Sequence, residues 1–358
     1  VDKPCTDHLS ATKLHHAFND ASEECYILAM PLLHLTGPAG LIFVTWAILG
    51  LLLAAVGLAA RRAFGSNRID ADSLWQDFWM GLALTLLALQ LWHLFLPVNW
   101  VPLGLLALVG SIALIRFRRE VGGLLLEFGL GDKWAAAATF LVWLWFANLS
   151  MAPTEVFDTG MYHMPVVVWS KAYAIVPGLG NLHGRLAFNN SHLLLGAMLD
   201  TGLWSGRAVH ITSGLFLFAL VGRFIPAGMR LARRQARPAD AFDFVLLAGV
   251  IHLALRGNIV SYSPDLAVTA VAFAAGSILY RWLTERQSQI SGSYSLLVIV
   301  TLLISAVTIK LTIFGFAVSA ALMAMALWSR EPRDSSLWRR TALSIILLGA
   351  TLTCVWLF

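Results

Sequence analysis

Apolar segments long enough to cross a lipid bilayer recur along most of this 358-residue chain. A helix that crosses the roughly 30 Å hydrocarbon core needs about 20 apolar residues. Because the bilayer core offers no water to hydrogen-bond the backbone, such segments form helices. The sequence therefore predicts an all-α, polytopic integral membrane protein with about ten transmembrane helices. The ten segments are Gly40–Ala60, Trp79–Leu96, Val101–Ile115, Trp134–Leu149, Val209–Ala227, Ala241–Leu255, Leu266–Trp282, Ser295–Ile309, Thr312–Trp328 and Ala342–Trp356.

The placement of the basic residues predicts the orientation of these helices. The net charge of +5 does not indicate a nucleic-acid partner, because the arginines sit in short clusters between apolar segments. Clusters follow the first, third, fifth, seventh and ninth segments, so they all fall on one side of the membrane. By the positive-inside rule that side is cytoplasmic. The ten histidines all lie in outer connections or in the outer half of a span. We therefore expect the protein's chemistry on the non-cytoplasmic face.

This topology divides the chain into four parts. We expect an outer N-terminal segment (1–38), four transmembrane helices (39–150), an outer loop (151–206) and six more transmembrane helices (207–358). Cys5 and Cys25 share the outer N-terminal segment, where an oxidising compartment permits a disulfide between them. Two free thiols are the alternative.

The outer loop, Met151–Gly206, is far longer than the ordinary connection of about 4 to 6 residues. Met161–Ile175 predicts an amphipathic helix lying along the membrane, capped by Asp158 or Thr159. Asn189–Leu199 predicts a second short helix, entered through Asn190 or Ser191. Two such interfacial helices would form a platform over the bundle. Tyr162, Val166, Trp169 and Tyr173 fall at helical spacing on one amphipathic face of the first helix.

Several strings in the chain resemble an uncharacterised family of bacterial polytopic membrane proteins, itself distantly similar to the GT-C glycosyltransferases. The resemblance covers the chain from about Trp75 onward. The most specific string is PGLGNLHGRLAFN, within Val176–Asn190. The others are WMGLALTLLALQLWHLFLPVNW (Trp79–Trp100), DTGMYH (Asp158–His163), SYSPDL (Ser261–Leu266) and TIKLT (Thr308–Thr312).

The GT-C resemblance implies a fold with interfacial helices in a long outer loop and a sugar-transfer activity. GT-C enzymes place an acidic residue in the first long outer loop, and Asp158 occupies that position if the fourth span begins their conserved seven-span module. The implied reaction moves a sugar from a polyprenyl-phosphate donor to an acceptor, with inversion. A carboxylate removes the acceptor proton, and cations stabilise the leaving phosphate. Many members carry a paired Asp-Glu, whereas Asp158 is followed by Thr159.

Three residues near the start of the first loop helix are candidates for catalysis or substrate binding. Asp158 is the candidate general base, although an Asp before a helix is also an ordinary N-cap. His163 could orient that carboxylate, bind a metal or contact phosphate. Tyr162 is a candidate substrate contact. The alternative for this pair is an interfacial tyrosine anchor beside a solvated histidine.

Cations elsewhere on the outer side are candidates for phosphate binding. Arg185 lies in a glycine-containing stretch that permits close backbone approach, though a tight turn alone also explains the glycines. Lys310 interrupts two apolar runs, so either it snorkels or it pairs with Asp265 or a donor phosphate. Asp265 follows Ser263 and Pro264, an ordinary helix opening, and is otherwise a supporting catalytic residue. Asn181, His183 and Arg256 are further candidate substrate-binding residues, and no metal ligand set is predicted.

A non-catalytic membrane subunit or assembly factor is the main alternative, since the same scaffold could bind a partner protein or lipid through the outer loop. A transporter is less favoured, because the polar residues sit at one rim rather than at the midplane. The expected location is the bacterial inner membrane, with the active face periplasmic or extracellular. The expected partners are membrane lipid, a polyprenyl-phosphate sugar and, in the alternative, another membrane protein. The need for a divalent metal is left open.

Overall fold

The computed structural model describes residues 37–65, 71–187, 190–285 and 289–330, with four further helical positions between 341 and 349. All of them belong to one compact unit, Gly37–Phe358. The described residues form helices and contain no strand. The long helices are α2 (Gly37–Phe64), α3 (Ala71–His93), α4 (Trp100–Arg116), α6 (Lys133–Leu149), α10 (Val209–Ala232), α11 (Pro238–Leu255), α12 (Pro264–Thr284), α13 (Gln289–Ile309) and α14 (Phe314–Trp328).

Nine of the ten predicted spans fall on these nine long helices. The tenth, Ala342–Trp356, lies largely outside the described residues, and so does the predicted Cys5–Cys25 disulfide. Six of the helical segments are individually long and apolar enough to cross a membrane, and α4 with its bent continuation would make a seventh. A polytopic membrane protein is therefore supported, whereas a count of ten stays a prediction.

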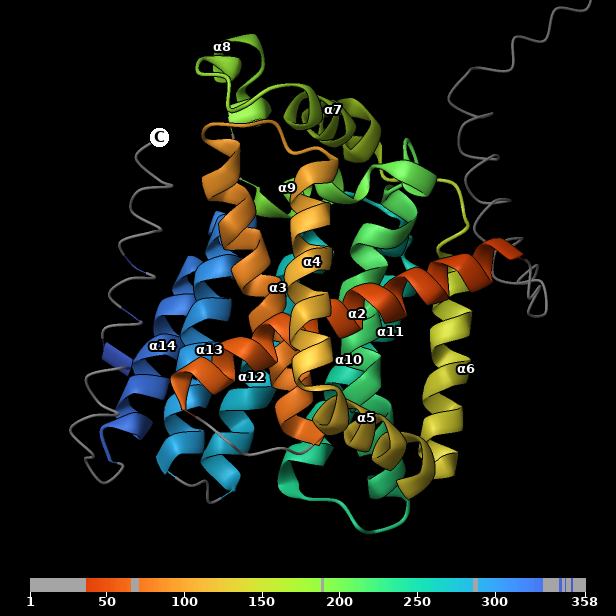
Figure 1. Cartoon of the computed structure of the whole chain (residues 1–358), viewed down its shortest axis with the longest axis vertical. Helices are drawn as coiled ribbons and strands as arrows, with labels where there is room; N and C mark the ends of the chain where they lie inside the picture. Colours follow the sequence, from red (N-terminus) through yellow and green to blue (C-terminus); the bar gives the residue numbers. More distant parts are fainter. Residues whose placement is uncertain are drawn as a thin grey trace, which may run out of the picture. The chain divides into compact units, whose positions relative to one another are not determined.

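The bundle has two distinct ends (Figure 1). At one end lie the short helices α7 (Met164–Ala172) and α8 (Leu179–Leu182), and we call this the platform end. At the other lie α5 (Arg118–Leu126) and the connection between α10 and α11, and we call this the arginine end. The helices before and after the central loop pack together, because α2 contacts α10 and α3 contacts α13.

Helix α2 crosses the bundle obliquely (Figure 1). Its 28 residues span about 42 Å, more than the bilayer core, so it must tilt if it crosses a membrane. Two glycines allow it to pack closely against α3. A Cβ atom on Gly57 of α2 would lie 1.8 Å from the carbonyl oxygen of Asp77, and one on Gly81 of α3 would lie 1.9 Å from that of Leu53. Only glycine permits this backbone contact, so the crossing point of α2 and α3 is fixed.

Buried ion pairs join the helices at the arginine end. The guanidinium of Arg61 on α2 donates to both carboxylate oxygens of Asp77 on α3, at 2.9 to 3.1 Å, and the Tyr294 hydroxyl also donates to Asp77 at 2.9 Å. Arg61 and Asp77 are both fully buried. The sequence interpretation used the Arg61 cluster only as a topology signal, and the structure adds that the Arg61 charge is neutralised by Asp77 inside the bundle.

A second buried network links four helices. Arg223 on α10 donates to Asp243 on α11 at 2.8 Å and to Asp72 on α3 at 2.5 Å. Asp72 also accepts from Arg281 on α12. The Arg223 guanidinium lies 4.9 Å from the centre of the Trp75 ring, which adds a cation–π contact. These arginines were also read as topology signals, yet both are buried and determine which helices are neighbours.

Candidate functional site

The central segment consists of several short helices at the platform end. The turn η2 (Thr159–His163) runs directly into α7, so the helix predicted at Met161–Ile175 begins earlier and stops at Ala172. Tyr173 then has extended backbone. One face of this helix is buried through His163, Val167 and Ser170. The segment continues through α8, η3 (Gly184–Ala187), α9 (Ser191–Leu199) and η4 (Gly202–Trp204).

Helix α9 is internal, whereas the sequence predicted a second interfacial helix at this place. It occupies the predicted place, with Asn190 at its N-cap position, but the Asn190 side chain makes no capping hydrogen bond. All nine residues of α9 are buried. The physical reason is that the helix has no polar face to present to solvent, and it contacts α3, α4, α7, α10, α12 and α13 instead. The platform therefore consists of α7 and α8 over an internal α9.

Asp158 does not cap the helix as the sequence allowed. Its side chain makes no capping hydrogen bond. The carboxylate accepts from the Tyr162 hydroxyl at 2.7 Å and pairs with Arg185 Nη1 at 3.1 Å. Arg185 Nη1 also donates to the Tyr162 hydroxyl at 3.0 Å, and its guanidinium lies 4.9 Å from the centre of the Tyr162 ring. Carboxylate, phenol and guanidinium thus form a closed triangle at the surface.

The pKa values of Tyr162 and Arg185 are both raised in this arrangement. Partial burial raises the pKa of Tyr162, and its hydrogen bond to Asp158 raises it further. The pKa of Arg185 is also raised, chiefly by its hydrogen bond to Tyr162 and then by the Asp158 charge. At neutral pH the triangle therefore contains a neutral phenol and a charged guanidinium.

A second acid–base pair lies at the same end of the bundle. Lys310 follows α13 and pairs with Asp265 in the first turn of α12. Ser263 caps α12 by accepting from the Asp265 backbone N–H, and Pro264 occupies the first turn. The expected helix opening and the expected pairing of Lys310 with Asp265 are both confirmed. Both side chains remain partly exposed, so the pair stays accessible from outside.

His163 lies beside the triangle, with its ring 4.3 Å from that of Tyr162. It is only 3% exposed, so the alternative of a solvated histidine is wrong. Burial lowers its pKa to about 4, against the opposing influence of Asp158 and Asp265 and with that of Arg185 and Lys310. At neutral pH the His163 imidazole is therefore uncharged.

Thr159, the neighbour of Asp158, hydrogen-bonds to Ser261, and Ser261 is linked through Ser263 to Asp265. The triangle and the Lys310–Asp265 pair therefore lie on segments that contact each other.

A row of hydrogen-bonded, uncharged polar side chains, here called the seam, runs inward from Thr159 in the η2 turn. Thr159 and Ser261 exchange a hydrogen bond at 2.8 Å between their hydroxyls. Ser213 donates its hydroxyl proton to the Ser261 carbonyl, and its oxygen lies 3.3 Å from His192 Nε2. Since the Ser213 proton is already committed, His192 Nε2 must be the donor, which leaves His192 Nδ1 as a free acceptor. Burial lowers the pKa of His192 to about 3, so this ring is also neutral.

Sequence reasoning missed this seam, apart from noting His192 as an outer histidine. Thr159 was considered only as a cap, and Ser261 entered only as a letter of the SYSPDL string. Serine and threonine inside membrane helices commonly bond to their own backbone, so their presence alone does not indicate a site. The signal that could have found them is that Thr159, Ser261 and His192 all lie within or beside the resemblance strings.

The remaining predicted residues divide into two groups. The imidazole Nδ1 of His183 accepts from the Arg185 backbone N–H at 3.3 Å, and its ring stacks 6.4 Å from that of Tyr162, so it borders the site. Asn181 is exposed on α8, and Arg256 is exposed at the end of α11. Within the described residues no ion pair joins Arg256 to the site. Across the same part of the chain, no group of three or more His, Cys, Asp or Glu side chains is arranged to hold a metal ion.

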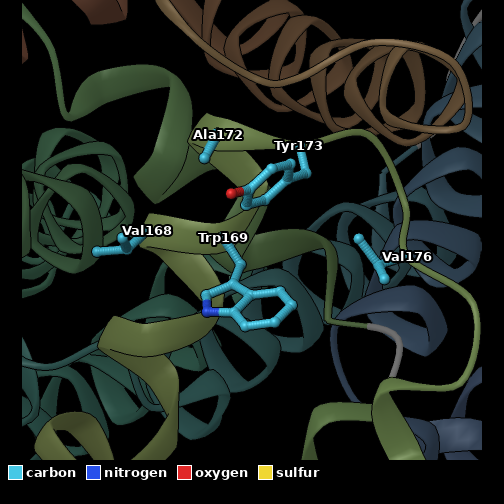
Figure 2. Close-up of a pocket in the computed structure, with 5 residues that line it drawn as sticks. All are labelled: Val168, Trp169, Ala172, Tyr173 and Val176. Atoms are coloured by element: carbon cyan, nitrogen blue, oxygen red, sulfur yellow. The ribbon is translucent and has the colours of Figure 1, made fainter.

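An apolar pocket of about 520 Å³ lies against the exposed side of α7. Figure 2 shows the rings of Trp169 and Tyr173 on this side, with Val176 across from them. Val168 and Ala172 complete the lining. Trp169 and Tyr173 belong to the face that the sequence predicted to be amphipathic. An aromatic, mostly apolar hollow of this kind is suited to hold hydrocarbon.

Comparisons with known proteins place the chain in a family but assign no activity. A family model described as a domain of unknown function (DUF8201) matches residues 40–358. No curated protein matches the chain, and no solved structure matches it. The similarity to GT-C glycosyltransferases is thus not supported by these comparisons and stays a prediction.

Proposed function

Because the chain belongs to a family of unknown function, DUF8201, we propose its function from the site itself: a membrane glycosyltransferase that moves a sugar from a polyprenyl-phosphate donor to an acceptor on the non-cytoplasmic face. The observation that carries the proposal is the presence of two partly exposed acid–base pairs whose segments are joined by the Thr159–Ser261 hydrogen bond, with the buried His163 beside Tyr162. Each pair joins a cation that can bind phosphate to a carboxylate that can accept a proton.

The donor phosphate would bind between Arg185 and Lys310. Arg offers two parallel N–H donors to a phosphate, and Lys supplies a compact positive charge. Exposed pairs contribute little stability, so exchanging a carboxylate partner for a phosphate costs little. That exchange would release Asp158 and Asp265 for chemistry. The apolar pocket on α7 would accept the first part of the lipid chain.

Asp158 would then act as general base. It accepts the proton of an acceptor hydroxyl while the hydroxyl oxygen forms a bond to the anomeric carbon of the sugar. The bond from that carbon to the phosphate oxygen breaks, and the electron pair leaves with the phosphate. Arg185 and Lys310 stabilise the charge that develops there. Tyr162 holds the Asp158 carboxylate in place, and the neutral His163 forms the floor of the site.

The arginine clusters support an orientation, because the described ones around α5 and the α10–α11 connection lie at the end opposite the platform. By the positive-inside rule the platform end would face the periplasm or the exterior. We infer the bacterial inner membrane as the location on the same grounds.

The test compares Asp158→Asn with the matched control Glu155→Gln, which removes an exposed carboxylate three residues earlier. A deletion strain should accumulate a polyprenyl-phosphate sugar and lack one sugar in a surface glycan, both measured by mass spectrometry. The Glu155→Gln gene should restore the glycan. Asp158→Asn should fail, because loss of a general base typically costs 10²- to 10⁴-fold in rate.

Two outcomes would contradict the enzyme. If deletion changes neither the lipid-linked sugars nor the glycans, sugar transfer is not the function. If a folded Asp158→Asn protein restores the glycan fully, Asp158 is not the base. Either outcome favours the alternative, a non-catalytic subunit or assembly factor that binds a partner or lipid through the platform.

A further inference from the structure

At the arginine end, helix α5 turns away from the long helices and forms a surface separate from the platform site. The helical stretch formed by α5 and the turn η1 (Glu127–Gly131) is bent by 81° from α4. In Figure 1 α5 leaves the foot of α4 and runs toward the start of α6. If α4 crosses the bilayer, a helix nearly perpendicular to it lies along the membrane surface. The stretch therefore sits where lipid head groups meet the hydrocarbon.

The stretch is apolar on two opposite sides. Val121 and Leu124 are buried against the bundle, and the Phe128 ring stacks on that of Trp143 with centroids 6.1 Å apart. On the opposite side Leu126 is 63% exposed and Leu130 is 78% exposed. A helix that only covered the bundle would need no second apolar side. Its outward leucines match a helix that inserts into a membrane interface.

The charges around this stretch are unequal, because most of the acids are already paired. Glu120 pairs with Arg62 at 2.5 Å, and Asp132 pairs with Arg233 at 2.5 Å. Among the described residues of this stretch, only Glu127 remains as an exposed acid without an ion pair. Four exposed cations make no ion pair with described residues: Arg116, Arg118, Arg119 and Lys133.

Two of these cations lie close to aromatic rings. The Lys133 ammonium lies 5.8 Å from the centre of the Trp134 ring, which is itself largely exposed. The Arg116 guanidinium lies 5.5 Å from that of Phe117. Tryptophan beside lysine or arginine is typical of a membrane interface, where the ring meets the hydrocarbon edge and the charge reaches the phosphates.

We propose that α5 and η1 form a binding surface for anionic phospholipid. The phosphates bind Arg116, Arg118, Arg119 and Lys133, and the acyl chains cover Leu126 and Leu130. Phospholipid fits better than an acidic soluble partner, because the outward leucines require hydrocarbon beside the negative charge. Each cation near an anionic membrane surface is expected to strengthen binding roughly fivefold. The surface is independent of the platform site and of any sugar-transfer activity.

The experiment titrates the full chain, purified in a neutral detergent, with phosphatidylglycerol or phosphatidylcholine and counts bound lipids by native mass spectrometry. We expect the first phosphatidylglycerol to bind at least tenfold more tightly than phosphatidylcholine. The triple variant Arg116→Gln, Arg118→Gln, Arg119→Gln should reduce this preference to within about twofold. Arg119→Gln alone should weaken phosphatidylglycerol binding roughly fivefold.

The matched control is Arg207→Gln, which removes an exposed arginine that follows η4 and should leave the preference unchanged. Circular dichroism checks that every variant keeps its helices. An equal affinity for both lipids in the wild-type chain would overturn the proposal. A preference that survives the triple variant would overturn it too. A dimer that disappears in Leu126→Ser, Leu130→Ser would instead show that a second copy covers this surface.

Discussion

The two ends of the bundle both carry ion pairs, but in the described part of the chain the fully buried pairs lie at the arginine end, beside partly exposed ones such as Arg233–Asp132. At the platform end Arg185 and Asp158 are 48% and 42% exposed, and Lys310 and Asp265 are 35% and 56% exposed. At the arginine end Arg61 and Asp77 are 1% and 0% exposed. Removing one partner of a buried pair leaves an uncompensated charge, whereas an exposed pair is worth little. Buried pairs therefore hold helices together, and exposed pairs are free to exchange partners with a ligand.

The largest expected effect is on stability at the arginine end. Asp77→Asn leaves the Arg61 charge buried without its carboxylate, so we expect the free energy of unfolding to fall by about 3–5 kcal/mol. Denaturant unfolding in detergent micelles, followed by circular dichroism, measures this change. Asp158→Asn is the matched change at the platform end and should cost about 0–1 kcal/mol. Equal losses in the two variants would remove the distinction between the ends.

A smaller effect is expected where α2 crosses α3. Gly57→Ala would place a Cβ atom 1.8 Å from the Asp77 carbonyl oxygen, so the two helices must separate. Overpacking of this kind typically costs about 1–3 kcal/mol. Gly160→Ala, in the platform segment, meets no atom within 4 Å and should change the unfolding free energy by less than about 0.5 kcal/mol. The melting temperatures of the two variants test whether close packing is confined to the bundle.

A further expected effect, spread over several pH units, appears as a pH dependence of stability. Burial lowers the pKa of His163 from 6.5 to about 4. As pH falls from about 6.5 toward 4, the unfolded chain takes up a proton at this histidine while the folded chain does not, so stability decreases. The slope contributed by one such group is at most about 1.4 kcal/mol per pH unit. The buried His192 should add a similar contribution.

His163→Gln should therefore flatten the dependence of melting temperature on pH between 4 and 6.5. His183→Gln is the control, because the His183 side chain is exposed in the folded protein. An unchanged slope in His163→Gln would show that this histidine is hydrated rather than buried.

The sequence predicted nine of the long helices and the placement of several polar candidates at one end of them, because both depend on residue type and order along the chain. Apolar length marks the helices, and each span reverses direction, so Asp158, His163, Asp265 and Lys310 were expected on one face. The pairing of Lys310 with Asp265 could be predicted for the same reason. Both lie at helix ends on that face.

Other features depend on which helices are neighbours, and the sequence of one chain does not contain that information. Arg223 could not be assigned to Asp243 and Asp72 until α10, α11 and α3 were placed side by side. Asp158 matched the pattern of an N-cap, but a tyrosine one turn later and an arginine 27 positions away compete for its carboxylate. The burial of α9 was missed because its length suits either a surface helix or an internal one.

The enclosure of α9 has a consequence for how the protein is made. Its nine residues span about 14 Å, too short to enter the membrane as a span during synthesis. Its neighbours include α3, α4 and α7, which are synthesised before it, and α10, α12 and α13, which are synthesised after it. The pocket that surrounds α9 is thus incomplete until α13 has been inserted. The platform packs on α9 through α7, so it rests on a helix whose neighbours are all present only after α13 has been synthesised.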